Sequence, residues 1–199
     1  EMLGERNAAA YISSVLLMVA NTKALQDCTP QSIYTSALRA ATLRLSVDQG
    51  MGQAYLVPFR NKAQGTVNAI LIIGYKGLYD MAVRTGRYRY INVGRVYQGE
   101  TVEENRITGL MSITGGRTGS NVIGYIGAFE MVNGFAKTIY MTVDEIDAHA
   151  RKYSKGYDNS DSFWKTQRAE MERKTVLRIL IRNWGYFDPS DAQFIELAE

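Results

Sequence analysis

The stretch ILIIGYKGLYDMAVR, residues 70–84, changes its pattern of apolar residues halfway along. Its first four side chains are large and aliphatic, and a β-branched run of this length is typical of a buried strand. Beyond the glycine that follows, Leu78, Met81 and Ala82 recur at the spacing of one helical face. We therefore predict that a strand ends at this glycine and that a helix covers about 77–85.

Lys76 lies at this junction, between Gly74 and Gly77. Glycine lets a backbone approach a ligand closely. A helix start offers free N–H groups and the positive end of the helix dipole, which favour an anion such as phosphate. Lys76 is therefore a candidate phosphate contact, and Tyr75 beside it is a candidate nucleic-acid-binding residue. The alternative, a strand-to-helix turn with a solvated lysine, stays open because Gly-x-x-Gly spacing alone has little specificity.

The composition is that of a globular protein. With 199 residues, 46% of them hydrophobic, the chain can bury a core, and we expect a single domain over 1–199. No apolar run reaches the roughly eighteen residues of a membrane span. The single cysteine, Cys28, excludes an internal disulfide and fits a reducing, cytoplasmic compartment. The single histidine, His149, excludes a histidine-cluster metal site.

The segment 1–46 is predicted to be helical. An amphipathic helix is expected over 6–25, and its apolar stripe consists of Ala9, Ile12, Val15, Leu16 and Val19. Thr29 and Pro30 then provide an N-cap and a proline at the first helical position, so a second helix is expected to begin there and run to about residue 45. Its inward residues are expected to be Ile33, Ala37, Leu38, Ala41 and Leu45.

The segment 47–141 is predicted to hold the strands. Residues 53–59 and 67–73 are expected to form a hairpin with a basic tip, which carries Arg60 and Lys62. Further strands are predicted at 87–97, where arginines and tyrosines interleave, and as a short pair within 102–113. Asn133-Gly134 is a strong hairpin signal between strands at 122–132 and 135–141.

The segment 142–199 is predicted to be helical again. Residues 142–145 match a capping box that starts a helix to about Tyr153. A long helix is expected over 163–184. Its apolar stripe consists of Val176, Leu177, Leu180 and Trp184. Lys174, Arg178 and Arg182 recur every four residues along the adjoining face.

The basic residues that stand out form three groups. They are Arg60 with Lys62; Lys76 with Arg84, Arg87, Arg89 and Arg95; and Lys174 with Arg178 and Arg182. A groove between these groups would attract nucleic acid, because cations neutralise phosphates and neighbouring tyrosines offer faces to unstacked bases. In the alternative interpretation Glu170 pairs with Lys174 and the other charges are solvated. Both interpretations remain open at this point.

Catalysis is not expected. Glu172 and Lys174, an acid and a lysine two residues apart, are the best trace of a metal-dependent nuclease. They lie in a helical pattern, where positions two apart do not share a face. No acid cluster on the predicted strands would hold two divalent ions. We therefore predict neither catalytic nor metal-binding residues.

Three segments together resemble the RecT family of phage-encoded single-strand DNA annealing proteins. They are ALRAATLRLSVDQGMGQAYLVPF (37–59), GYKGLYDMAVRTG (74–86) and MERKTVLRIL (171–180), in the family's order. The resemblance covers nearly the whole chain from about Pro30. It implies an α+β fold, with a small twisted antiparallel sheet packed against helices. The N-terminal and C-terminal helices would serve assembly and a DNA groove.

The resemblance also implies the function. Such a protein would bind single-stranded DNA and the annealed duplex intermediate, assemble into rings or helical filaments, and anneal complementary strands without bond chemistry. It would not require ATP, and Mg²⁺ would act at most as a modulator. Expected partners are a phage exonuclease and a host single-strand-binding protein, and no membrane. The expected location is the cytoplasm of a bacterial host, with the gene carried by a phage or prophage.

Two rival functions are kept. The first is a metal-dependent DNA nuclease or another nucleic-acid-processing enzyme, whose activity would require Mg²⁺ and carboxylates. The second is a scaffold protein that uses its basic patches for protein contacts, and it would show no salt-dependent DNA binding. For the annealing protein we expect head-to-tail assembly through the apolar N-terminal helices and the hydrophobic side of the helix at 163–184.

Overall fold

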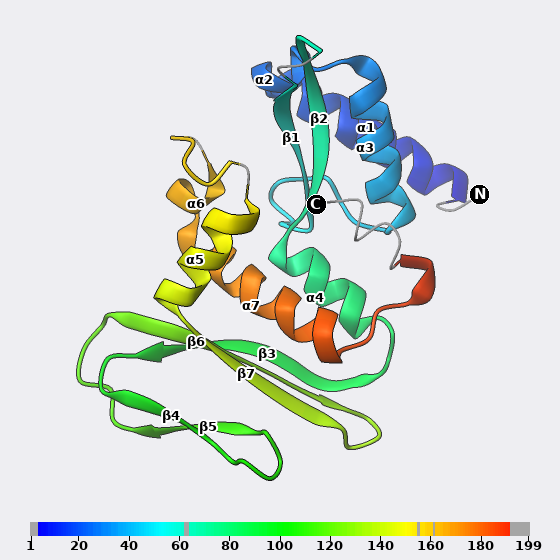
Figure 1. Ribbon diagram of the computed structural model, residues 1–199. Helices are drawn as coiled ribbons and strands as arrows, with labels where there is room; N and C mark the ends of the chain where they lie inside the picture. The colour runs from blue at the N-terminus through cyan, green and yellow to red at the C-terminus, as the bar shows by residue number, and fades with distance from the viewer. Residues whose placement is uncertain (1–3, 62–63, 155, 161, 192–199) are drawn as a thin grey trace. The chain divides into compact units, whose positions relative to one another are not determined.

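The computed structural model describes residues 4–61, 64–154, 156–160 and 162–191 (Figure 1). The chain divides into two compact units: unit 1 comprises Glu1–Met81 with Phe187–Glu199, and unit 2 comprises Ala82–Tyr186. Both contain helices and antiparallel strands, so the predicted α+β class, with small antiparallel sheets packed against helices, is confirmed. The expected single domain, with segments 1–46, 47–141 and 142–199, stays a prediction.

Unit 1 contains a two-stranded hairpin of β1 (Ala54–Asn61) and β2 (Thr66–Ile73). The strands pair antiparallel along their whole length, with the first residue of β1 opposite the last of β2. Pro58 is tolerated in β1 because this strand is paired on one edge only within its two-stranded sheet. The hairpin predicted from 53–59 and 67–73 is confirmed.

α3 (Pro30–Thr42) covers one face of this hairpin. The Ser36 hydroxyl donates a hydrogen bond to the carbonyl oxygen of Ala69 at 2.9 Å, and the Ala69 amide donates to the Ser32 hydroxyl at 2.9 Å. Two serines of the helix thus satisfy both backbone groups of one β2 residue. Small side chains at the predicted inward positions Ala37 and Ala41 are buried and allow this close approach.

α3 ends three residues earlier than predicted. Arg44 adopts the left-handed conformation, with φ of 55°, and a helix cannot continue through it. Leu45 is nevertheless buried as expected, whereas Leu38, also expected inside, is exposed. The predicted burial is therefore confirmed for most of the stripe and wrong for Leu38.

α1 (Gly4–Asn21) and the short α2 (Lys23–Gln26) replace the single N-terminal helix that the sequence predicts. The backbone of Thr22 is extended, with φ −118° and ψ 94°, and this breaks the helix. Ile12 and Leu16 of the apolar stripe are 58% and 65% exposed. Much of the apolar stripe of α1 is therefore uncovered.

α4 (Tyr75–Val83) begins two residues before the predicted start, because the amide of Leu78 already donates to the carbonyl of Gly74 at 3.0 Å. It follows β2 after a single residue, so the predicted change from strand to helix at this glycine is confirmed. The predicted helix was expected to run to residue 85, but α4 ends at Val83. The division between the two units falls inside this helix, after Met81.

Unit 2 is built on a three-stranded antiparallel sheet. Its strands are β3 (Tyr88–Tyr97), β6 (Val122–Met131) and β7 (Ala136–Thr142), in the order β3-β6-β7. β6 and β7 are joined at the predicted Asn133-Gly134 turn, where Gly134 has φ of 86°. The predicted strand at 87–97 and the predicted hairpin at 122–141 are both confirmed.

A second hairpin in unit 2 consists of β4 (Glu100–Glu104) and β5 (Met111–Gly115). It is the predicted pair of short strands, and Figure 1 shows it on the side of the three-stranded sheet away from α7. The Asn105 side-chain oxygen accepts hydrogen bonds from the amides of Ile107 and Thr108, which orders the turn. This turn leaves Ile107 96% exposed.

α5 (Val143–Tyr153) begins with the predicted capping box. The Glu145 amide donates to the Thr142 hydroxyl at 3.2 Å, and the Thr142 amide donates to the Glu145 carboxylate at 2.8 Å. Both the start and the end of this helix agree with the prediction.

The predicted helix at 163–184 is two helices, α6 (Phe163–Thr166) and α7 (Arg168–Trp184). Gln167, with φ −138° and ψ 47°, interrupts it. α7 packs on the three-stranded sheet, and its buried apolar residues are Val176, Leu177, Leu180 and Ile181. A Cβ on Gly127 of β6 would come within 3.2 Å of two of these side chains, so the glycine makes room for the helix. Across the described ranges, no helix is long and apolar enough to cross a membrane.

Candidate nucleic-acid interface

The two glycines beside Lys76 are needed for packing within unit 1. A Cβ on Gly74 would lie 2.3 Å from the carbonyl oxygen of Gly52, and a Cβ on Gly77 would lie 2.2 Å from that of Gln53. The Gly74 amide also donates to the Gln53 carbonyl at 2.8 Å. The close approach that the sequence predicts for a ligand is thus made by the protein's own loop before β1.

Lys76 lies exposed in the first turn of α4. Its stem passes the α-carbon of Gly52, because a Cβ placed there would lie 3.2 Å from Lys76 Cδ. Tyr75 is half-buried and stacks on Tyr79, with ring centroids 6.4 Å apart. The ammonium group is therefore carried on a supported stem near a helix N-terminus, where an anion is favoured.

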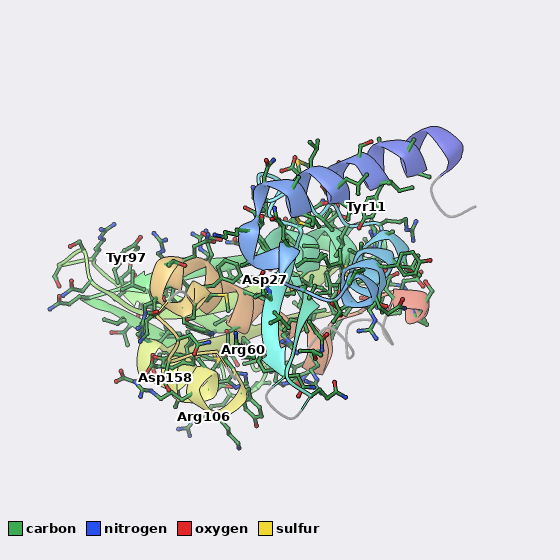
Figure 2. The ribbon with its side chains drawn as sticks, turned by 90° about the horizontal axis from the view of Figure 1, so that it is seen from above. Tyr11, Asp27, Arg60, Tyr97, Arg106 and Asp158 are labelled. Atoms are coloured by element: carbon green, nitrogen blue, oxygen red, sulfur yellow. The ribbon has the colours of Figure 1, made fainter. Side chains whose placement is uncertain are left out.

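Of the predicted hairpin tip, Arg60 is exposed near the end of β1, where Figure 2 labels it. Lys62 lies outside the described residues. Lys76 and Arg60 are the predicted cations that the structure describes in unit 1, and the remaining ones belong to unit 2.

The predicted arginines at the start of unit 2 have different surroundings. Arg84 is half-buried and Arg87 is exposed, with its guanidinium carbon 3.9 Å from the centroid of the Tyr186 ring. Arg89 is exposed and pairs with Glu130 at 2.5 Å. The two exposed arginines thus already have an aromatic ring and a carboxylate beside them.

Arg95 belongs to a polar network between the sheet and α7. It bonds to the hydroxyls of Tyr97 and Tyr125, which raises the pKa of the guanidinium; Tyr97 is labelled in Figure 2. The Tyr125 hydroxyl donates to Glu172 at 2.8 Å, and Arg168 donates to the other oxygen of Glu172 at 2.8 Å. Burial, and next the bond to Glu172, raise the pKa of Tyr125 to about 12. Arg95 is thus placed to organise unit 2.

The predicted cations of α7 recur every fourth residue on one face of the helix. Lys174 and Arg178 are half-buried, whereas Arg182 is exposed. Burial, with a smaller contribution from Arg178, lowers the pKa of Lys174 to about 7. Burial and then Arg182 lower the pKa of Arg178. Glu170 pairs with Arg173 and not with Lys174 as the alternative interpretation expects: Oε1 of Glu170 lies 3.9 Å from Nη1 of Arg173.

The same row faces α5. The pKa of His149 is lowered by burial and then by the charges of Arg178 and Lys152. No described residue forms a hydrogen bond or an ion pair with the Lys174 ammonium group. This face of α7 therefore concentrates positive charge that an added anion would neutralise.

Glu172 is the carboxylate that a metal-dependent nuclease would use. Its side chain is buried and hydrogen-bonded to Tyr125 and Arg168. Among the residues that the structure describes, no group of three or more His, Cys, Asp or Glu side chains could hold a metal ion.

Sequence reasoning missed one cluster, at the C-terminal end of α7. Trp184 was assigned to the apolar stripe, but its side chain is 41% exposed, and the Lys137 ammonium nitrogen lies 5.0 Å from its ring centroid. Tyr186 follows, with Arg87 over its ring. The signal in the sequence was only an aromatic residue two positions after Arg182, which does not by itself reveal a partner on β7.

Comparison with known proteins shows that the resemblance to the RecT family extends along most of the chain. Residues 9–190 match the model of the RecT family. The uncharacterized protein YqaK of Bacillus subtilis (strain 168) is 38% identical over 186 residues, which cover 93% of this chain and 62% of that protein. Protein RecT of Escherichia coli (strain K12) is 29% identical over 163 residues, which cover 80% of this chain and 60% of that protein. The chain thus spans about three fifths of the length of these curated relatives.

Proposed function

Because this chain belongs to the RecT family, we propose that it is a single-strand DNA annealing protein of homologous recombination. It binds single-stranded DNA through phosphate contacts and promotes pairing with a complementary strand. The bases stay free to be tested by pairing, so specificity comes from complementarity and the protein needs no bond chemistry.

The observation that supports this function most is the row of cations on α7. Like charges four residues apart destabilise one another, and burial adds a cost that lowers the pKa of Lys174. A helix that tolerates such a row gains when phosphates lie beside it, because each contact also releases counterions. Lys76 and Arg60 are the proposed contacts that unit 1 contributes.

Annealing over many nucleotides requires many copies of the chain, since one copy spans only a few nucleotides. We therefore propose self-association into rings or helical filaments on single strands and on the annealed duplex intermediate. ATP is not required, and Mg²⁺ modulates at most. The proposed setting is the cytoplasm of a bacterial host, with a phage or prophage gene, a phage exonuclease and a host single-strand-binding protein as partners.

The test combines binding, annealing and cleavage. Anisotropy of a labelled single strand should show affinity that falls with salt, with a log-log slope of about −3.5 if all five of these cations contact phosphates. Two complementary dye-labelled strands should pair faster with the protein than alone, without ATP. Salt-independent binding, or no acceleration of pairing, would contradict the proposal. Cleavage of the labelled DNA with Mg²⁺ would favour the nuclease instead.

A further inference from the structure

The C-terminal end of α7 presents an aromatic side chain that the core does not use. Trp184, the last residue of the helix, keeps 41% of its surface exposed, and Phe135, which immediately precedes β7, is also exposed. The Phe135 ring centroid lies 5.8 Å from that of Phe129, and Phe129 is opposite Lys137 in the sheet, so all three side chains lie on the same face. This face is the one on which Lys137 reaches the Trp184 ring.

The chain leaving α7 is held rigidly at this point. The Tyr88 hydroxyl donates to the carbonyl oxygen of Tyr186 at 2.9 Å and accepts from the Tyr186 amide at 2.5 Å. A Cβ on Gly185 would lie 2.6 Å from the same hydroxyl, so only glycine fits between them. The backbone between Trp184 and Tyr186 is therefore tied to β3, which reduces the entropy lost when a ligand binds.

Cations accompany both rings. The Lys137 nitrogen lies 5.0 Å from the Trp184 centroid, and the Arg87 guanidinium carbon lies 3.9 Å from the Tyr186 centroid. Arg182 is exposed in the last turn of α7. No acid occurs in the sequence from 81 to 99, which includes Arg87. An aromatic face flanked by cations suits a planar base joined to phosphates.

We propose that Trp184 is a stacking platform for an unstacked base of single-stranded DNA, with Lys137 and Arg87 close to the adjoining phosphates. This proposal rests on the proposed function and adds a base-contacting site to it. A single strand is the fitting ligand because its bases can expose a face, whereas the bases of a duplex are stacked on one another.

Intrinsic fluorescence tests the stacking directly. The chain has two tryptophans, and Trp164 is only 5% exposed, so a quench caused by added oligothymidylate reports on Trp184. The quench should appear with oligothymidylate and be much smaller with an abasic oligonucleotide of equal length. Trp184→Phe should remove the quench and keep most of the affinity. Trp184→Ala should weaken binding about 5- to 150-fold, the range of base-aromatic stacking.

Tyr153→Ala is the matched control, because Tyr153 is an exposed aromatic residue on α5 and should change neither signal. Thermal melting of each variant separates lost binding from lost folding. If Trp184→Ala does not fold, the comparison between normal and abasic oligonucleotides with the wild-type protein decides.

Anisotropy of labelled DNA distinguishes failure of this proposal from failure of the proposed function. Wild-type protein that does not bind a single strand at all would refute the function. Normal binding without a quench, or equal affinity for normal and abasic DNA, would overturn the stacking site alone. A quench that grows with protein concentration and does not respond to DNA would show that a second copy covers the ring, which also overturns it.

Discussion

At the scale of a single side chain, Lys76 is a proposed phosphate contact. It is exposed, its stem is supported by Gly52, and it lies in the first turn of α4. Its loss should therefore remove a charge without opening the core. A lysine that served only as a solvated surface residue would predict no change in DNA binding.

We predict that Lys76→Ala weakens single-strand binding and annealing while leaving thermal melting unchanged. If one phosphate contact is lost, the log-log salt slope should become shallower by about 0.7. Lys23→Ala, an exposed lysine on α2, is the control and should behave as wild type. Wild-type annealing by Lys76→Ala would remove this residue from the interface.

Lys174 makes stability depend on pH. Its pKa is about 7 in the folded chain, against an ordinary value of 10.5. Between these values the unfolded state binds a proton that the folded state does not, so stability rises with pH across this window. Below about pH 7 the cost of the buried charge is fully present.

Lys174→Met should therefore raise the melting temperature clearly at pH 6 and little at pH 10, and it should weaken single-strand binding at pH 6, where the lysine is charged, more than at pH 10. Lys165→Met, at an exposed position on α6, serves as the control for a lost surface charge. A melting shift that is the same at both pH values would refute the lowered pKa of Lys174.

At the scale of elements, the glycines before and inside α4 let the loop at 48–53 lie against the start of that helix. The added Cβ at Gly77 would lie 2.2 Å from the Gln53 carbonyl oxygen and 3.1 Å from Cγ2 of Ile73. Gly74 and Gly77, which flank Lys76, are thus required for packing, and they also determine the position of this lysine.

Gly77→Ala should destabilise the protein by roughly 1–3 kcal/mol, the usual cost of overpacking. Gly116→Ala is the matched control, since nothing lies within 4 Å of a Cβ at that position, and it should change stability by less than about 1 kcal/mol. Denaturant unfolding of both variants measures the difference. Equal stability of the two variants would show that the loop at 48–53 shifts at little cost to accommodate the added methyl group.

Local signals predicted most of the elements. The Asn-Gly turn and the capping box at Thr142 act within a few residues, so their hairpin and helix were placed correctly. The break at Gln167 and the exposed stripe of α1 have no local signal, because they depend on which surfaces other elements cover. Arg95 shows the same limit for the site: its partner Tyr125 lies on another strand, and only the folded sheet brings the two together.

At the scale of the whole molecule, Ile12, Leu16 and Leu17 of α1 are exposed, and we propose this apolar stripe as an assembly contact. Leu16→Gln should lower the sedimentation coefficient of the protein on single-stranded DNA, because a polar side chain weakens an apolar contact between copies. Ser13→Gln, at an exposed position of the same helix, is the control. Unchanged sedimentation of Leu16→Gln would place the assembly contact elsewhere.

The chain enters unit 2 once and leaves it once, and Tyr88 ties the two ends of that unit together at Tyr186. Unit 1, by contrast, includes a segment that follows unit 2 in the sequence, and Asp191 of this segment is buried. On a translating ribosome, unit 2 therefore has all its residues before unit 1 does. A chain truncated after Tyr186 should keep the amide hydrogen-exchange protection of β3, β6 and β7 and lose protection selectively in unit 1.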